Sequence, residues 1–128
     1  MAKLYIYGDS FSDYYMPELV TKFWFEYVAN HFNLELVHRA VSGNGWNRIK
    51  NKMFLDSCRW EKEDVIITCP SYFSRVDIID FYVEETLNIG LCSWISNLDE
   101  TPKREKFYKE EWYSISKFIK KQGYVYYT

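Results

Sequence analysis

Four short segments of the chain are rich in apolar and β-branched residues, and we expect each of them to be a β-strand. They cover residues 3–7, 34–38, 64–68 and 124–128. Segments of this length that end in Gly, Asp, Asn or Ser are typical of strands followed by turns. The first three segments are each followed by such small polar residues, so the pattern predicts strands with tight turns at their ends.

Between these segments the apolar residues recur at helical spacing. Pro17 suits the first turn of a helix, and an apolar stripe follows it, made of Leu19, Val20, Phe23, Trp24, Tyr27 and Val28. A second helix is expected over residues 44–57. Its inward face would carry Trp46, Ile49 and Met53.

A third helix is expected from Thr101 to about Lys121, because a threonine followed by proline is a typical helix start. Its inward face would carry Tyr108, Trp112, Ile115 and Ile119, and Gly123 suits its C-terminal cap. Residues 76–87 fit a helix by spacing, yet they are dense in β-branched and aromatic residues, so helix and strand both remain open. Residues 88–100 are expected to be a loop or short turns.

Strands that alternate with helices predict a parallel sheet joined by right-handed crossovers. The fold class expected here is therefore α/β, a three-layer α/β/α sandwich with a parallel sheet of about four strands. At 128 residues the chain is expected to form one domain over residues 1–128.

Composition and charge exclude several classes of protein. Hydrophobic residues make up 48% and aromatic residues 20% of the chain, which argues against disorder and suggests that some rings line a pocket or a partner surface. The net charge is −2 and no basic run occurs, so we expect no nucleic-acid partner. No apolar stretch is long enough to span a bilayer, so no membrane association is expected.

The cysteines predict a reducing environment. Cys58, Cys69 and Cys92 are an odd number and lack the spacing of metal ligands. No charged-then-apolar signal precedes the first strand. We therefore expect a cytoplasmic protein with free thiols, no metal and no cofactor. Cys69 is expected to be a small buried residue rather than a nucleophile, because no base lies next to it in the sequence.

The turn after the first strand is the most informative candidate site. Residues 4–12 read LYIYGDSFS, so an apolar strand ends in Gly8, Asp9 and Ser10. Gly8 permits a tight turn, Asp9 can accept hydrogen bonds from nearby backbone, and the Ser10 hydroxyl is left at the end of the strand. Ligands of open α/β sheets bind at this edge.

Two other strands end in the same way. Ser42-Gly43-Asn44 follows the second strand, and Cys69-Pro70-Ser71 follows the third. Parallel strands bring their C-terminal ends to one edge of a sheet. We therefore expect Ser10, Gly43 and Ser71 to lie at the same edge.

These turns resemble the conserved blocks of the SGNH (GDSL) hydrolase family. The resemblance maps Ser10 to the family's nucleophile and Gly43 to the glycine whose backbone N–H binds the oxyanion. It also implies the strand order 2-1-3-4 of a flavodoxin-like layout. The family's third block, Gly-x-Asn-Asp, is replaced here by residues 69–72, CPSY, so its oxyanion Asn is missing. The fourth block, Asp-x-x-His, and the strand and helix that carry it in the family have no counterpart.

A serine hydroxyl needs a base within hydrogen-bond reach to become a good nucleophile. The chain has two histidines, His31 and His38. His31 falls at the end of a helical stripe and is expected to be packed or solvated. His38 ends the second strand, so it is the candidate base if it faces Ser10. Asn44 and Asn47 are candidate side-chain donors to an oxyanion.

Two classes of function remain open at this point. One is a catalytically incomplete relative of the SGNH hydrolases that binds a small anionic or acyl ligand, or engages a protein. The alternative is a serine ester or acyl hydrolase that uses Ser10 with His38 as an atypical base. The missing blocks predict weak or absent hydrolysis. Helix N-termini beyond Ser10 and Gly43 would favour an anionic group.

The last strand predicts an assembly surface. Residues 124–128 read YVYYT and lack the Lys, Pro or acidic residues that usually protect a sheet edge. We expect this strand to lie at an edge of the sheet and apolar residues near it, such as Trp112, to be open. A homo-oligomer or a partner protein would then cover the C-terminal region.

Overall fold

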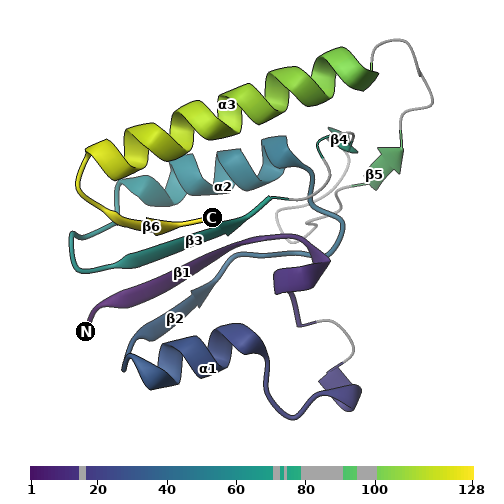
Figure 1. Cartoon of the computed structure of the whole chain (residues 1–128). Helices are drawn as coiled ribbons and strands as arrows, with labels where there is room; N and C mark the ends of the chain where they lie inside the picture. The colour runs from purple at the N-terminus through teal and green to yellow at the C-terminus, as the bar shows by residue number, and fades with distance from the viewer. Residues whose placement is uncertain (15–16, 71–72, 74, 79–90, 95–100) are drawn as a thin grey trace.

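Four parallel strands form the central sheet in the computed structural model, which describes residues 1–14, 17–70, 73, 75–78, 91–94 and 101–128. The strands lie in the order β2-β1-β3-β6, as Figure 1 shows. Their bounds are Lys3–Gly8 for β1, Glu35–His38 for β2, Val65–Cys69 for β3 and Val125–Tyr127 for β6. The prediction of an α/β fold with a four-stranded parallel sheet is confirmed.

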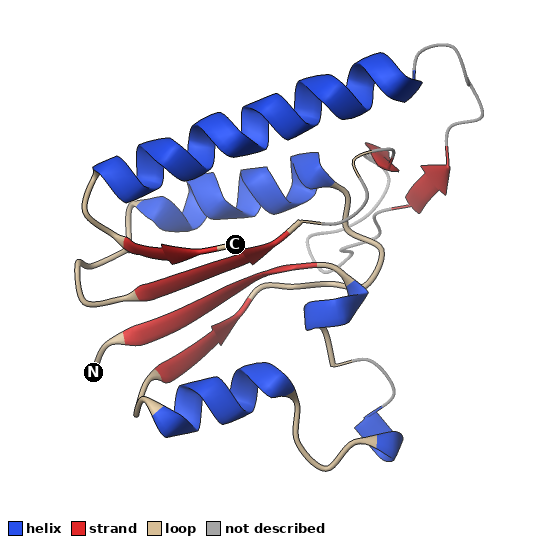
Figure 2. Cartoon of the chain, viewed as in Figure 1, coloured by secondary structure: helices blue, strands red, loops and turns tan. Residues whose placement is uncertain are grey.

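Helices lie on both faces of this sheet (Figures 1 and 2). Leu4 and Ile6 of β1 pack with Phe25 and Ala29 of α1, which spans Trp24–His31. Tyr5 and Tyr7 point to the other face, because successive residues of a strand alternate. That face is covered by α2 (Trp46–Ser57) and α3 (Thr101–Lys121).

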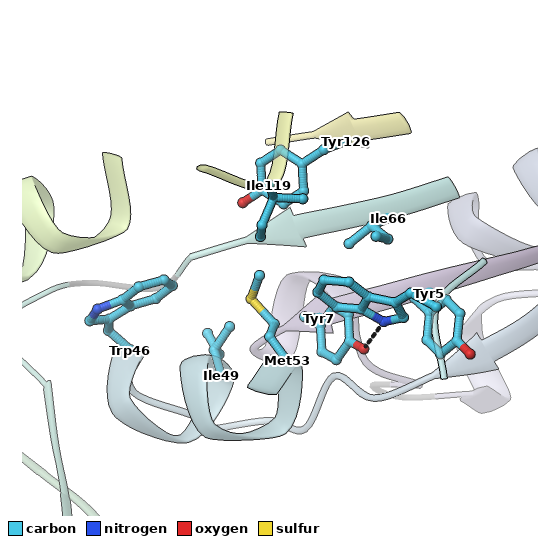
Figure 3. Close-up of a cluster of buried hydrophobic side chains, with 9 residues drawn as sticks. Tyr5, Tyr7, Trp46, Ile49, Met53, Ile66, Ile119 and Tyr126 are labelled. Atoms are coloured by element: carbon cyan, nitrogen blue, oxygen red, sulfur yellow. Dashed lines mark hydrogen bonds between the residues drawn. The ribbon is translucent and has the colours of Figure 1, made fainter. Parts of the chain in front are cut away.

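The larger hydrophobic core lies between the sheet and helices α2 and α3, as Figure 3 shows. The predicted inward face of α2 is confirmed, because three of its side chains are almost fully buried there: Trp46, Ile49 and Met53. They meet Tyr7 and Ile66 of the sheet and Ile119 of α3. The edge strand closes this core with Tyr126, which is also buried.

Helix α1 differs from its prediction. Residues Pro17–Leu19 form a separate turn of 3₁₀-helix, and α1 begins only at Trp24. The Glu26 carboxylate accepts the Phe23 N–H at 2.7 Å and so marks this start. The predicted inward stripe was wrong for four exposed residues: Leu19, Val20, Trp24 and Tyr27. Phe25 and Ala29 form the buried face instead.

Residues 75–100 also differ from expectation where the structure describes them. Arg75–Ile78 form β4 and Leu91–Trp94 form β5, and the two strands pair in antiparallel fashion. The question of helix or strand for residues 76–87 is thus settled in favour of strand up to Ile78. The loop expected over 88–100 was wrong for β5. Residues 79–90 and 95–100 lie outside the described part of the chain.

The third predicted helix is confirmed. Trp112 and Ile115 are partly buried against the core, and Ile119 is buried in it. Gly123 has the positive φ of +84° that suits a helix C-terminal cap. Trp112 is therefore not the open apolar surface that was expected. Within the described residues no helix, α3 included, is both long enough and apolar enough to cross a membrane.

We predict that Gly8→Ala lowers the free energy of unfolding by about 1–3 kcal/mol, because the added methyl group has too little room where Gly8 of β1 pairs with Cys69 of β3. A Cβ at Gly8 would lie 3.0 Å from the Cys69 carbonyl oxygen and 3.1 Å from the Ser12 side chain. Urea unfolding measures the change. Ala2→Gly, at the partly buried start of the chain, serves as the control, and an equally small effect of both substitutions would contradict the close approach of the Gly8 and Cys69 backbones.

Candidate functional site

The Ser10 turn is built by hydrogen bonds from Asp9. The Asp9 carbonyl accepts the Ser12 N–H at 3.0 Å, and its carboxylate accepts the Phe11 N–H at 3.1 Å. These bonds form a single 3₁₀ turn, Ser10–Ser12, directly after β1. The local role expected of Asp9 is thus confirmed. The Ser10 side chain is half-buried and makes no hydrogen bond to any described residue.

The Gly43 turn follows β2 at the same edge of the sheet. Its hydrogen bond joins the Asn44 N–H to the Val41 carbonyl at 3.1 Å. Gly43 stands third in this four-residue turn with φ of +84°, as a type II turn requires. A residue with a Cβ is strained in that conformation, so glycine at this position is a structural requirement whether or not a ligand binds.

Four hydrogen bonds fasten the two turns to each other. The Gly8 carbonyl accepts the Val41 N–H at 3.2 Å and the Asn44 Nδ2–H at 3.0 Å. The Asp13 carboxylate accepts both the N–H and the hydroxyl of Ser42, at 2.6 and 2.8 Å. Gly43 lies between the two tethered residues Ser42 and Asn44. The turn that carries Ser10 and the turn that carries Gly43 therefore form one unit.

This unit leaves two backbone donors open. The N–H groups of Ser10 and Gly43 make no hydrogen bond within the described residues, since the turn bonds use Ser12 and Asn44 instead. Asn44 is fully buried, and its Oδ1 has no donor among the described residues. Open N–H groups in tight turns are the usual partners of a carbonyl oxygen or a small anion.

The Nε2 nitrogen of His38, the candidate base for Ser10, is already engaged in another hydrogen bond. It pairs with Ile6 in the sheet, and its ring packs against Phe25 and Tyr14, with centroids 4.8 and 4.7 Å away. Its Nε2 lies 2.6 Å from the Ser12 carbonyl oxygen. A carbonyl only accepts hydrogen bonds, so Nε2 carries the proton and donates it. That nitrogen cannot accept a proton from Ser10.

The other predicted site residues do not all lie together with the Ser10 and Gly43 turns. The Asn44 amide donates to Gly8, as above, and the Asn47 Nδ2–H donates to the Tyr108 hydroxyl at 3.0 Å, which directs Asn47 toward α3. His31 ends α1, and a crossover helix ends at the opposite edge of the sheet from the Ser10 turn. Ser71 lies outside the described residues.

Cys69, at the end of β3, is partly buried, not fully buried as was expected. Burial raises its pKa above the ordinary cysteine value, and Asp9 adds a smaller contribution, while the Ser12 hydroxyl acts in the opposite direction. A raised pKa lowers the fraction of thiolate, which is the reactive form. Cys69 thus lies beside the Ser10 turn as a packing residue.

A polar network that the sequence did not predict lies between the sheet and α2. Arg39 Nε and Nη2 donate to the Asp56 carboxylate at 3.0 and 3.3 Å, and the Tyr7 hydroxyl donates to the same carboxylate at 3.0 Å. The Trp60 indole N–H completes the network by donating to Tyr7 at 3.2 Å (Figure 3). No local sequence pattern predicts this network, because Tyr7, Arg39 and Asp56 lie far apart in the sequence.

Comparison of the chain with protein-family models, curated proteins and solved structures gives no significant match. None of these comparisons tests the resemblance to the SGNH hydrolases that the sequence predicted at Ser10 and Gly43. Among the described residues, no group of three or more His, Cys, Asp or Glu side chains is arranged to hold a metal ion.

Proposed function

We propose that this chain is a small-ligand-binding protein of SGNH-like, three-layer α/β/α layout, which holds the oxygen of an acyl group or small anion without hydrolysing its ligand. The N–H groups of Ser10 and Gly43 would bind that oxygen, and the Ser10 hydroxyl would add a third donor. The rigid connection between the two turns supports the proposal, because preorganised donors bind oxygen without further ordering cost.

The observation that carries the proposal is the hydrogen bond from His38 Nε2–H to the Ser12 carbonyl. It engages Nε2 of His38, the last residue of β2, with a backbone carbonyl, while the ring contacts Tyr14 and Phe25. His31, the other histidine of the chain, ends α1. Binding without turnover therefore fits the geometry better than the alternative, a serine hydrolase with His38 as base.

An amide-resolved NMR titration with acetate and with methyl acetate tests this function. We expect saturable shifts of the Ser10 and Gly43 amide signals with at least one of the two probes. Asp13→Ala, which releases the tether to Ser42, is expected to weaken binding about tenfold, since hydrogen bonds to a carboxylate contribute about 1.5–3 kcal/mol.

Ser57→Ala is the matched control, because its hydroxyl bonds only the Phe54 carbonyl on α2, away from the turns. It should bind the probes as the unmodified protein does. Unchanged Ser10 and Gly43 signals up to the solubility of both probes would refute the proposed function.

Association through β6 is a second candidate function. Among the described strands β6 pairs only with β3, so it is an edge of the sheet, as predicted. Its outward residues Val125 and Tyr127 are 39% and 59% exposed. Edge strands with unpaired backbone groups and apolar side chains readily pair with another chain.

We predict a dimer or larger assembly at micromolar concentration, measured by sedimentation velocity. Val125→Lys should shift the equilibrium toward monomer, because a charged side chain on an edge opposes strand pairing. Val20→Lys is the matched control, since Val20 is 41% exposed and lies away from β6. A monomer in the unmodified protein, or equal effects of both substitutions, would remove this candidate.

A further inference from the structure

A second pocket lies between β2 and α2, and its polar side chains belong to neither of the two turns. It encloses about 380 Å³ and is lined by the backbone segment 38–41 together with Lys52, Leu55 and Asp56. This volume is within the range of small-ligand sites. Two cations, Arg39 and Lys52, and one carboxylate, Asp56, line it.

Arg39 is held in place from the core. Its guanidinium is bound through two nitrogens to Asp56, a residue only 6% exposed. Asp56 is fixed in turn by the hydroxyl of Tyr7, and Tyr7 by the indole of Trp60. The cation is therefore positioned in advance, while 39% of the Arg39 side chain remains accessible to a ligand.

Lys52 is the unusual member of the pocket. It is partly buried, and its ammonium donates one hydrogen bond, to the Arg39 carbonyl at 3.2 Å. No carboxylate of the described residues lies within ion-pair distance of it. Burial, followed by repulsion from Arg48 and Arg39, lowers the pKa of Lys52 below the ordinary lysine value. A bound anion would offset both the loss of solvation of the Lys52 ammonium and its repulsion from the two arginines.

The charges around the pocket favour an anion. Asp56 forms an ion pair with Arg39, and its attraction for Lys52 is smaller than the repulsion from Arg48, which lies one helical turn away. Asp13 acts in the opposite direction, but its carboxylate already accepts two hydrogen bonds from Ser42. Of the remaining lining residues, Ala40, Val41 and Leu55 are apolar and would contact the organic part of a ligand, and the other is His38.

We propose that the pocket between β2 and α2 binds a small phosphate monoester, with Lys52 and Arg39 on the phosphate and the apolar residues on its organic group. A phosphate monoester carries between one and a half and two negative charges near pH 7 and three acceptor oxygens, which suits two cations on one wall. This site does not depend on the proposed acyl site, because its donors are the side chains of Lys52 and Arg39, whereas those of the acyl site belong to Ser10 and Gly43.

Calorimetry and an NMR titration with phenyl phosphate test the proposal. We expect saturable binding that shifts the amide signals of Arg39, Val41 and Lys52 and leaves those of Ser10 and Gly43 less affected. Lys52→Met, which keeps the stem and removes the charge, should weaken binding about tenfold or more. Lys52→Arg should retain most of it.

Lys109→Met is the matched control, because it makes the same change in net charge at an exposed position of α3. It should leave the affinity within about twofold, well under the tenfold that corresponds to 1.4 kcal/mol. An equal loss in Lys109→Met and Lys52→Met would overturn the proposal, since the attraction would then be unspecific. Equally tight binding of benzyl alcohol would also overturn it, since charge would not be recognised.

If Lys52→Met fails to fold, as judged by thermal unfolding, the unmodified protein decides the question. Saturable phenyl phosphate shifts confined to the pocket amides support the site, and the absence of such shifts overturns it.

Discussion

Asp56→Ala is expected to lower the free energy of unfolding by about 3 kcal/mol. The Asp56 carboxylate accepts hydrogen bonds from the Tyr7 hydroxyl and from two nitrogens of Arg39. Tyr7 is fully buried, so the substitution leaves its hydroxyl without an acceptor in the core. Arg39 is partly solvated, so the loss of its ion pair contributes the smaller share. Urea unfolding measures this change in free energy, provided that the variant and the unmodified protein have the same m-value.

Two further variants separate these contributions. Asp56→Asn keeps an acceptor oxygen for Tyr7 but removes the charge, so it should cost less than Asp56→Ala. Glu61→Ala is the control, because Glu61 is an exposed acidic residue just after Trp60. An effect of Asp56→Ala no larger than that of Glu61→Ala would show that the network does not stabilise the fold.

Hydrolysis of simple esters is expected to be close to the uncatalysed rate. A positioned general base contributes about 10²–10⁴-fold to such reactions, and the imidazole of His38 is committed to Ser12. Turnover of p-nitrophenyl acetate should therefore be the same for the unmodified protein and for Ser10→Ala. Robust turnover that Ser10→Ala abolishes would contradict this and would require a base other than His31 or His38.

The sheet could be predicted from the sequence because its strands are short, apolar and separated by helices. Each predicted strand of the main sheet exists to within about two residues, and the C-terminal strand lies at the edge. The inward faces of α2 and α3 were also predictable, because large apolar residues recur at helical spacing along each helix, although others, such as Phe54 and Phe118, are exposed. Helix α1 was not, since Trp24 and Tyr27 compete with Phe25 and Ala29 as candidate core residues, and only packing against β1 decides between them.

The candidate site was predictable only in its backbone. The glycines and small polar residues after β1 and β2 indicate turns at one edge of the sheet, and both turns are there. The direction of the His38 side chain depends on packing with Tyr14 and Phe25 and on a hydrogen bond to Ser12, which no local pattern encodes. The network around Asp56 was missed for the same reason, because its members lie far apart in the sequence.

Labelling with a fluorophosphonate, which modifies activated serine hydroxyls, tests the central claim most directly. Intact-mass measurement of the unmodified protein and of Ser10→Ala should show no adduct on either, because the Ser10 hydroxyl has no histidine base. One adduct per chain on the unmodified protein, mapped to Ser10 and absent from Ser10→Ala, would contradict the account and identify the protein as an active serine hydrolase.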